Sequence, residues 1–305
     1  MRKERKDLQR APVEVKGRSP AASRKANAHV KEPRAPQKAK TKKSAGEDRY
    51  LITALARGLS VLSAFKPGDD TLTNLELARR TGLAKATVTR LTHTLRYLGY
   101  LSNCSETGRF RLHPHVLSLG YPVLANLGIR QMARPAMQEL ADYSGGTVSL
   151  GARDMLHIIF VERVRNRSVV TLPLDVGSCI PIATTSSGRA YIAAISESER
   201  AQLLSEIKAA YPQNWPRLKR GIEAACEEYN KFGYCSTIGD WEPNINAVGV
   251  PLRLPDGQVL AFTCGGPSSR IQPGMIQDLG DRLKQLAEGV QMVHLSSPAS
   301  FVAGR

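Results

Sequence analysis

The segment from Lys85 to Leu98 separates its side chains by type onto two sides of a predicted helix. One side is apolar at spacings of three and four residues, which is typical of a helix packed against a core: Val88, Leu91, Leu95 and Leu98. The other side is small, basic or hydrogen-bonding and contains no acid: Lys85, Ala86, Thr87, Thr89, Arg90 and His93. Such side chains can approach a DNA groove closely and donate hydrogen bonds to phosphates and base edges. The pattern favours a recognition helix over an ordinary solvated face, which would more often contain acids.

The flanking residues predict the elements that position this helix. Apolar residues at helical spacing from near Arg49 predict a first helix: Leu51, Leu55, Leu59, Leu62 and Phe65. Thr73-Asn74-Leu75-Glu76 has the form of a capping box, in which side chains satisfy free N–H groups at a helix start. The short helix 74–80 then ends at Gly82. Two helices joined by a glycine turn are a helix-turn-helix.

The period changes from helical to alternating after Gly99. Residues 100–104 and 109–112 flank Ser105-Glu106-Thr107-Gly108, which predicts a β-hairpin with a glycine in its turn. A hairpin directly after a recognition helix is a wing. Arg109 and Arg111 share one face of their strand, from which they could reach DNA phosphates.

Positive charge is concentrated in the first third of the chain. Residues 1–47 hold 15 Lys and Arg against 5 Asp and Glu, and residues 48–113 hold 10 against 5. Residues 114–305 are nearly neutral, with 18 against 17. A polyanion would therefore meet the N-terminal part. Residues 1–47 lack large apolar side chains and are predicted to be a disordered tail, either without specific use or attracted to phosphates.

Composition limits the compartment and the cofactors. No run approaches the roughly 18–20 apolar residues of a membrane span, and no apolar stretch follows the charged N-terminus, so we expect a cytoplasmic protein. The five cysteines are scattered without metal-site spacing, which indicates reduced thiols and no metal site. No cofactor-binding motif is present either, so we expect none.

The C-terminal half mixes strands and helices. Strands are predicted at residues 147–153, 156–163, 169–172, 247–254 and 258–264. Helices are predicted at 113–127 (a linker helix bent at Pro122), 129–143, 185–195, 197–207, 215–232 and 276–293. Strands bracketed by helices indicate an α+β domain.

The order of these elements resembles the IclR family of transcriptional regulators. In the first half the run LARGLSVLSAF…LTNLELARRTGLAKATVTRLTHTLRYLGYLSNCSETGRFRLHPHVLSLG is similar to the family's DNA-binding domain, departing at Ala84 and Ala86, where relatives often have Pro and Ser. In the second half VGSCIPIATTSSGRAYIA and KFGYCSTIGDWEPNINAVGVPLRLPDGQVLAFTCGGPSSR resemble the family's effector-binding domain. The resemblance implies a mainly α winged helix-turn-helix domain followed by an α+β, GAF-like domain that binds a small molecule.

Carrying the family's ligand positions over residue by residue gives a candidate effector site: Ser186, Ser187, Arg189, Thr237, Ala247, Thr263 and Gly265. Several relatives have an acid in place of Thr237 and a Cys in place of Ala247. The hydroxyls suit a carboxylate or carbonyl ligand, with Arg189 as a candidate charge partner. The hypothesis is a small organic acid, with aromatic acids as candidates. The alternative is that these residues are structural, since Ser and Thr at helix starts are commonly caps.

The sequence fits two other function classes less well. Ser186-Ser187-Gly188-Arg189 is not a nucleophile elbow and no phosphate-binding or metalloprotease motif occurs, so no catalytic residue is expected. A purely architectural DNA binder would not need a neutral second domain. The expected organisation is a tail (1–47), a DNA-binding domain (48–113), a linker helix (114–128), an effector domain (129–296) and a tail (297–305). The expected partners are operator DNA, an effector and further copies of the chain, as a dimer or tetramer.

Overall fold

The computed structural model describes residues 50–166 and 173–296. The two predicted tails and the predicted strand Val169–Leu172 lie outside the described residues. Within the described ranges, no helix combines the length and the hydropathy that crossing a bilayer requires.

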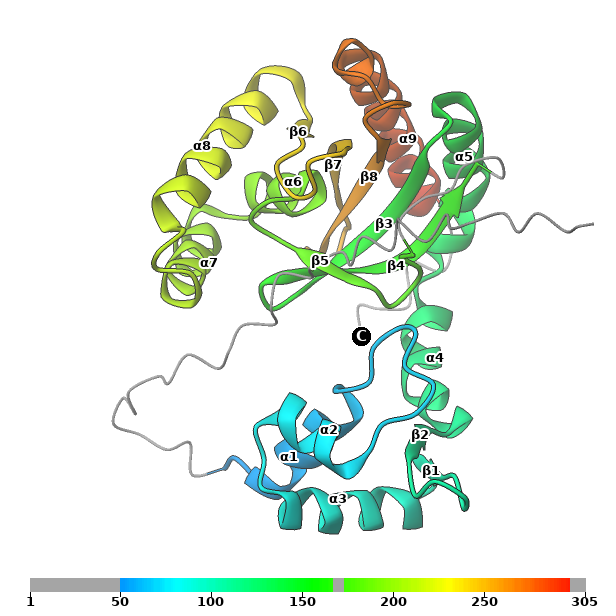
Figure 1. Ribbon diagram of the computed structural model, residues 1–305. Coiled ribbons are helices and arrows are strands. Elements are labelled where there is room, and N and C mark those ends of the chain that lie inside the picture. Colours follow the sequence, from blue (N-terminus) through cyan, green and yellow to red (C-terminus); the bar gives the residue numbers. More distant parts are fainter. Residues whose placement is uncertain (1–49, 167–172, 297–305) are drawn as a thin grey trace, which may run out of the picture. The chain divides into compact units, whose positions relative to one another are not determined.

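Three helices and a hairpin form the first group of elements: α1 (Thr53–Leu62), α2 (Asn74–Thr81), α3 (Lys85–Tyr97), β1 (Leu101–Asn103) and β2 (Phe110–Leu112). β1 and β2 pair antiparallel, and a bridge from Leu72 to Phe110 joins the segment before α2 to the hairpin. The core between these elements is apolar: Val61, Leu72, Leu77, Ala78, Val88, Leu95 and Leu101. Figure 1 shows the hairpin at the C-terminal end of α3. The structure confirms the predicted winged helix-turn-helix.

Local signals at both ends of α2 fix its length. The Thr73 hydroxyl accepts a hydrogen bond from the Glu76 backbone N–H (3.1 Å), and the Glu76 carboxylate accepts one from the Thr73 N–H (2.7 Å), so the predicted capping box is confirmed. These bonds, with the charge of Arg109, hold the pKa of Glu76 below its ordinary value. At the other end Gly82 has φ +70°, a left-handed conformation that glycine adopts without strain. The chain therefore turns at once into α3.

The apolar stripe predicted for the first helix lies mostly at the surface. Leu51, Leu55 and Leu59 are 62, 60 and 51% exposed, whereas Val61 is fully buried. Leu98, which we predicted to face the core, is 52% exposed, and that prediction is wrong. Apolar periodicity identifies the side of a helix that favours burial, but it does not show whether the same domain or another molecule buries that side.

Short helices lie between the two groups of elements in the chain. A 3₁₀ turn (Pro114–Val116) leads into α4 (Leu117–Asn126), and α5 (Ile129–Ser144) follows it in the chain. Pro122 lies inside α4, where it removes one backbone donor.

The second group is a six-stranded antiparallel sheet in the order β5-β4-β3-β8-β7-β6. Its strands are β3 (Thr147–Asp154), β4 (His157–Arg165), β5 (Cys179–Pro181), β6 (Cys235–Ile238), β7 (Ile245–Arg253) and β8 (Val259–Pro267). The helices are α6 (Ser186–Ala194), α7 (Glu197–Ala210), α8 (Trp215–Phe232) and α9 (Ile276–Ser296), with a 3₁₀ turn (Pro273–Met275) before α9. The predicted α+β class is confirmed. The short edge strands β5 and β6 were not predicted.

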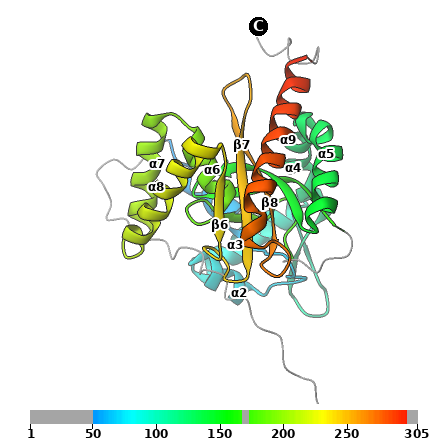
Figure 2. The same cartoon turned by 90° about the horizontal axis from the view of Figure 1, so that it is seen from above.

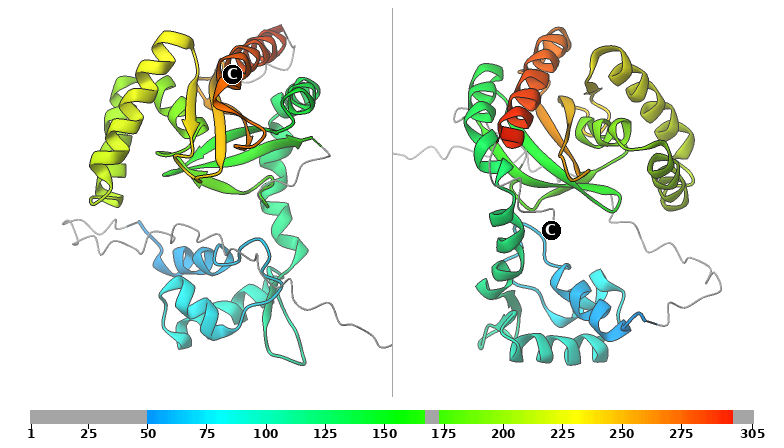
Figure 3. Two further views of the ribbon diagram at one scale, coloured as in Figure 1. Left: turned by 45° about the horizontal axis from the view of Figure 1, so that its top comes forward. Right: turned by 180° about the vertical axis from the view of Figure 1, so that it is seen from behind.

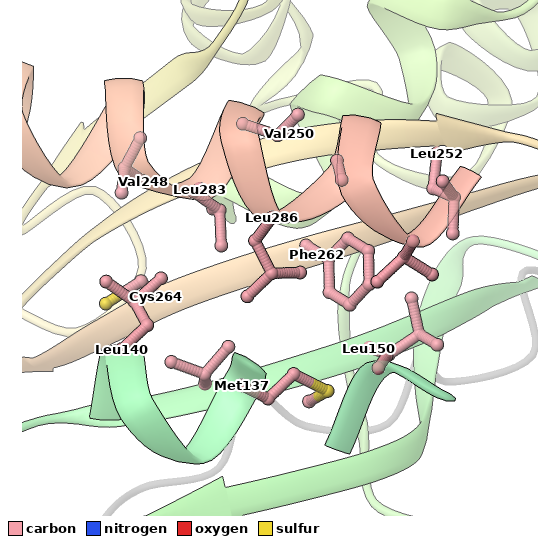
Figure 4. Packing of buried hydrophobic residues seen from close by; sticks show 14 of the residues in the cluster. Met137, Leu140, Leu150, Val248, Val250, Leu252, Phe262, Cys264, Leu283 and Leu286 are labelled. Atoms are coloured by element: carbon pink, nitrogen blue, oxygen red, sulfur yellow. The ribbon is translucent and has the colours of Figure 1, made fainter. Parts of the chain in front are cut away.

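Helices cover both faces of this sheet. Seen from above, α5 and α9 lie together on one side of the strands, and α6, α7 and α8 lie on the other (Figure 2), an arrangement that both views of Figure 3 repeat. Under α5 and α9, strand residues such as Val248 and Phe262 pack against Met137 and Leu283 (Figure 4). A separate cluster around Ile182 and Ile192 packs α6, α7 and α8 on the opposite side. Neither core fills the space between the start of α6 and the sheet, and a cavity lies there.

Candidate functional site

The outer side of α3 presents most of the residues predicted to contact DNA. Five are exposed: Lys85, Ala86, Thr89, Arg90 and His93. Thr87 is half-buried. Thr89 is exposed, but its hydroxyl donates to the Lys85 carbonyl (3.0 Å) and accepts from the Asn74 side chain (2.9 Å), so it ties α3 to α2.

Tyr97 belongs to the same side of α3 and was missed from the sequence. Residues of a helix advance by about 100° each, so Tyr97 falls in line with Ala86, Arg90 and His93. Its side chain is 86% exposed. The sequence pattern that predicts a recognition helix consists of small and basic residues, and a large aromatic side chain does not belong to it.

The start of α3 is electropositive. Ala84 is the N-cap and makes no side-chain capping bond, and no acid lies in the first turn. The N-terminal N–H groups of a helix carry partial positive charge, which adds here to the charges of Lys85 and Arg90. This surface favours phosphate groups.

The two wing arginines differ in their contacts. Arg109 donates to the Thr71 hydroxyl (2.8 Å), to the Thr71 carbonyl (3.0 Å) and to Glu76 (3.1 Å), so it braces the hairpin against α2. Arg111 makes one exposed ion pair with Asp70 (3.1 Å). Exposed pairs contribute little stability, so Arg111 can exchange Asp70 for a phosphate at small cost.

A cavity lies between the sheet and the start of α6. Two rows of residues run across the strands that form its floor. The first row is Arg163, Ser149, Thr263 and Gly249, and the second is Arg165, Thr147, Gly265, Ala247 and Thr237. Small side chains in these rows leave space above the sheet, and the hydroxyls around them supply polar groups. The cavity has a volume of about 630 Å³, including the part that opens to solvent.

Close backbone approaches place the start of α6 over this floor. A Cβ on Gly249 would lie 2.5 Å from the Ser186 carbonyl, and a Cβ on Gly188 would lie 2.0 Å from the Ile182 oxygen. Glycine is required where backbones approach so closely. Ser186 and Ser187 are consequently buried against the sheet.

Six of the seven predicted effector residues line this cavity: Ser186, Ser187, Thr237, Ala247, Thr263 and Gly265. The seventh, Arg189, lies elsewhere. It pairs with Asp240 at 2.5 Å and donates to the Ala183 carbonyl at 3.2 Å, and the cleft that it lines is a different one. Arg189 is therefore already neutralised and is not the charge partner within the cavity.

The sequence reasoning missed five polar residues that line the cavity, namely Thr147, Ser149, Arg163, Thr185 and Trp241. Among the described residues, nine buried side-chain nitrogen and oxygen atoms lack a hydrogen-bond partner. Seven of these atoms belong to residues lining the cavity: Thr147 Oγ1, Arg163 Nε and Nη1, Ser186 Oγ, Ser187 Oγ, Trp241 Nε1 and Thr263 Oγ1. Buried polar groups are nearly always hydrogen-bonded, so such a cluster indicates a ligand site.

The cavity is positively charged. Of the described residues that line it, Arg163 is the only charged one. Burial lowers the pKa of Arg163 from its ordinary value, although an arginine remains protonated at neutral pH. Within the described ranges, no group of three or more His, Cys, Asp or Glu side chains is placed to hold a metal ion.

A winged helix-turn-helix followed by a sheet domain with a buried polar cavity defines a class of protein: transcriptional regulators that respond to small molecules. Comparison with known proteins specifies the family. Residues 54–103 match the IclR helix-turn-helix domain, and residues 121–292 match the C-terminal domain of bacterial IclR transcriptional regulators. The chain belongs to the IclR family of DNA-binding transcriptional regulators.

Individual relatives agree with this assignment. The chain is 32% identical over 246 residues to the HTH-type transcriptional regulator TsaQ1/TsaQ2 of Comamonas testosteroni, covering 79% of this chain and 88% of that protein. It is 27% identical to the Pca regulon regulatory protein of Pseudomonas putida, covering 80% and 84% of the two chains.

Solved structures give the same result. An IclR family regulator from Brucella abortus is 42% identical, with a TM-score of 0.73 over 81% of this chain and 94% of that one. An IclR homologue from Microbacterium hydrocarbonoxydans, solved with 4-hydroxybenzoate, has a TM-score of 0.63 over 80% of this chain and all of that one. At 21% identity it shows a likeness in fold.

Proposed function

We propose that this regulator binds operator DNA through the outer side of α3 and the wing, and that a small organic acid in the cavity changes its affinity for the operator. The observation that supports the ligand is the cluster of seven unpaired buried polar atoms in a cavity with one cation and no acid among its described lining residues. An aromatic acid is the favoured candidate, because Phe160 and Trp241 also line the cavity. The Microbacterium homologue was solved with an acid of this kind.

Within the DNA-binding surface we assign direct contact to the predicted residues whose side chains do not bond to α2, and to Tyr97. Their small, basic and hydrogen-bonding side chains suit base edges and phosphates: Lys85, Ala86, Thr87, Arg90, His93, Tyr97 and Arg111. Thr89 and Arg109 support this surface from behind, because their hydrogen bonds run to α2 and to the segment before it.

We also propose that the protein acts as a homo-oligomer, a dimer or a tetramer. Two recognition helices would read half-sites on successive turns of DNA. Exposed apolar side chains on α1 and α4 offer surfaces for association: Leu55, Leu59, Leu117, Leu119, Tyr121 and Val123.

The proposed division of labour follows the predicted boundaries. Residues 48–113 bind DNA, 114–128 link, and 129–296 bind the effector, with tails at 1–47 and 297–305. We propose that the protein works in the cytoplasm and is not an enzyme. The relatives are transcriptional regulators, and the described lining of the cavity offers no His, Asp or Glu to act as a general base.

Selection of bound duplexes from genomic DNA, with and without benzoate-type acids, tests both halves of the proposal. We expect enrichment of a two-half-site sequence whose yield changes with the acid. Arg90→Ala should weaken binding to that sequence by about 10- to 100-fold, the worth of a good base or phosphate contact. Arg220→Ala, which removes the same charge from an exposed position on α8, is the control. Absence of any preferred duplex, or an unchanged affinity of Arg90→Ala, would contradict the proposal.

A further inference from the structure

Arg163 is a half-buried cation without a hydrogen-bond or ion-pair partner among the described residues. Its Nε and Nη1 atoms are inaccessible to solvent and have no hydrogen-bond partner. No ion pair joins it to any described carboxylate, although Asp175 is near enough to favour its charged form. The guanidinium lies 5.6 Å from the centre of the Phe160 ring. Burying guanidinium N–H groups without an acceptor is costly, so this position favours an anion that accepts from them.

A bulge in β4 brings Arg163 to the cavity. Phe160 and Arg163 are three residues apart, and regular alternation would place them on opposite faces of the sheet. The register shifts between Leu150 and Gly151, so that Leu150 pairs with Glu162 but Gly151 pairs with Phe160. One extra residue in β4 thereby puts Phe160 and Arg163 on the same side, where both line the cavity.

We infer that Arg163 binds the carboxylate of the effector and restricts this cavity to singly charged aromatic acids. The inference rests on the proposed effector function and specifies its ligand. Arginine suits the role because its planar donors match the two oxygens of a carboxylate. A second carboxylate would be buried without a cation, since the described lining holds no other positive charge, and a dianion is therefore disfavoured.

The remaining lining defines the rest of the ligand. Phe160, Ile180, Ile245 and Trp241 provide apolar and aromatic surface for a ring. The unpaired hydroxyls can donate or accept, so they suit a neutral polar substituent on that ring. Trp241 Nε1 can only donate and would pair with an oxygen of the ligand.

Calorimetric titration with matched aromatic ligands tests the inference. The probes are benzoate and 4-hydroxybenzoate, their neutral amides benzamide and 4-hydroxybenzamide, and the dianion benzene-1,4-dicarboxylate. We expect the wild-type protein to bind at least one monoacid about 10- to 100-fold more tightly than the corresponding amide, the worth of a charge-assisted contact. The dicarboxylate should bind at least about tenfold more weakly than that monoacid.

Variants at Arg163 assign the charge preference to one residue. Arg163→Gln should remove the preference for acid over amide, and Arg163→Lys should keep part of it, because lysine retains the charge without the planar fork. Arg253→Gln removes an exposed arginine at the end of β7 that does not line the cavity, and it should leave the preference intact. Melting temperature and operator binding of each variant report whether it folds.

Three results would overturn the inference: amides that bind as tightly as acids, an acid preference that survives in Arg163→Gln, or a wild-type protein that binds none of the acids. If operator binding persisted in the last case, the DNA-binding function would stand and the assignment of the cavity would fall. Loss of operator selection in the wild-type protein would instead count against the proposed function itself.

Discussion

Glu162 offers a test of how the effector cavity communicates with the linker helix. It adjoins Arg163 in β4 but lies on the opposite face, where its buried carboxylate pairs with Arg130 (3.1 Å) and Arg134 (2.5 Å) of α5. Arg130 also donates to the Leu124 carbonyl near the end of α4 (3.0 Å). A ligand that engages one face of β4 therefore acts on a strand whose other face is bonded to α5, and Arg130 of α5 is bonded in turn to the linker helix α4.

The substitution Glu162→Gln removes the charge and keeps the shape. Breaking a buried ion pair costs about 3–5 kcal/mol, because a charge is left uncompensated. Here Arg134 is 59% exposed and can be hydrated, whereas Arg130 is only 19% exposed. We therefore expect a loss of about 1–3 kcal/mol in the free energy of unfolding. For a domain of this size the melting temperature should fall by about 2–10 °C.

The coupling between effector and operator binding shows whether Glu162 transmits the effect of the ligand or only stabilises the fold. If ligand and operator binding are coupled by about 1–3 kcal/mol, the effector changes operator affinity about 5- to 150-fold in the wild-type protein. In Glu162→Gln this ratio should fall toward 1, while the affinity for the ligand changes little. Gel-shift titration with and without effector measures the ratio.

A second ion pair of the same sheet domain supplies the control. Glu206→Gln breaks the half-exposed pair with Arg153 (3.1 Å), so it should cost less than about 1 kcal/mol and leave the ratio unchanged. A Glu162→Gln protein that melts early but keeps its full ratio would refute the coupling role and leave Glu162 with a structural one.

Three further outcomes are expected. Gly188→Ala should destabilise the effector domain by about 2 kcal/mol or more and weaken acid binding, because its Cβ would meet the Ile182 carbonyl; a melting temperature equal to wild type would contradict this. In native protein at pH 8, iodoacetamide should label Cys104 long before Cys264, and mass spectrometry of tryptic peptides gives the order. Hydrogen bonds from Thr107 lower the pKa of Cys104, whereas burial raises the pKa of Cys264 to about 11. Removing residues 1–47 should lower non-specific DNA affinity and flatten its salt dependence, and an unchanged slope would show that the tail does not contact DNA.

The DNA-binding domain was predictable because its signals are local. Thr73 and Glu76 cap one helix within four residues, and Gly82 ends it, so neighbouring side chains alone specify the turn. The contacts that reach across the domain were not predictable. Arg109 was predicted to face DNA, yet it bonds to Thr71, 38 positions earlier, because the hairpin folds back onto α2.

The effector cavity was partly predictable, and mainly through family resemblance. Positions such as Thr237 and Thr263 could be carried over because strand register conserves which residues share a face. The charge partner could not be carried over in this way. The sequence does not show which of Arg189 and Arg163 is free to bind a ligand. Asp240, 51 positions after Arg189, pairs with Arg189 and neutralises it, whereas Arg163 has no such pair among the described residues.

The bulge in β4 explains why the second arginine escaped notice. Alternation along residues 156–163 assigns Phe160 and Arg163 to opposite faces, and the sequence Val161-Glu162-Arg163-Val164 gives no sign of the extra residue. The bulge turns both Val161 and Glu162 toward α5, so that Glu162 reaches its two arginines and Arg163 reaches the cavity. One irregularity in the strand thus creates the anion site and its link to α5 together. A variant that removed the bulge by deleting Val161 should therefore lose acid binding and coupling at once, rather than one without the other.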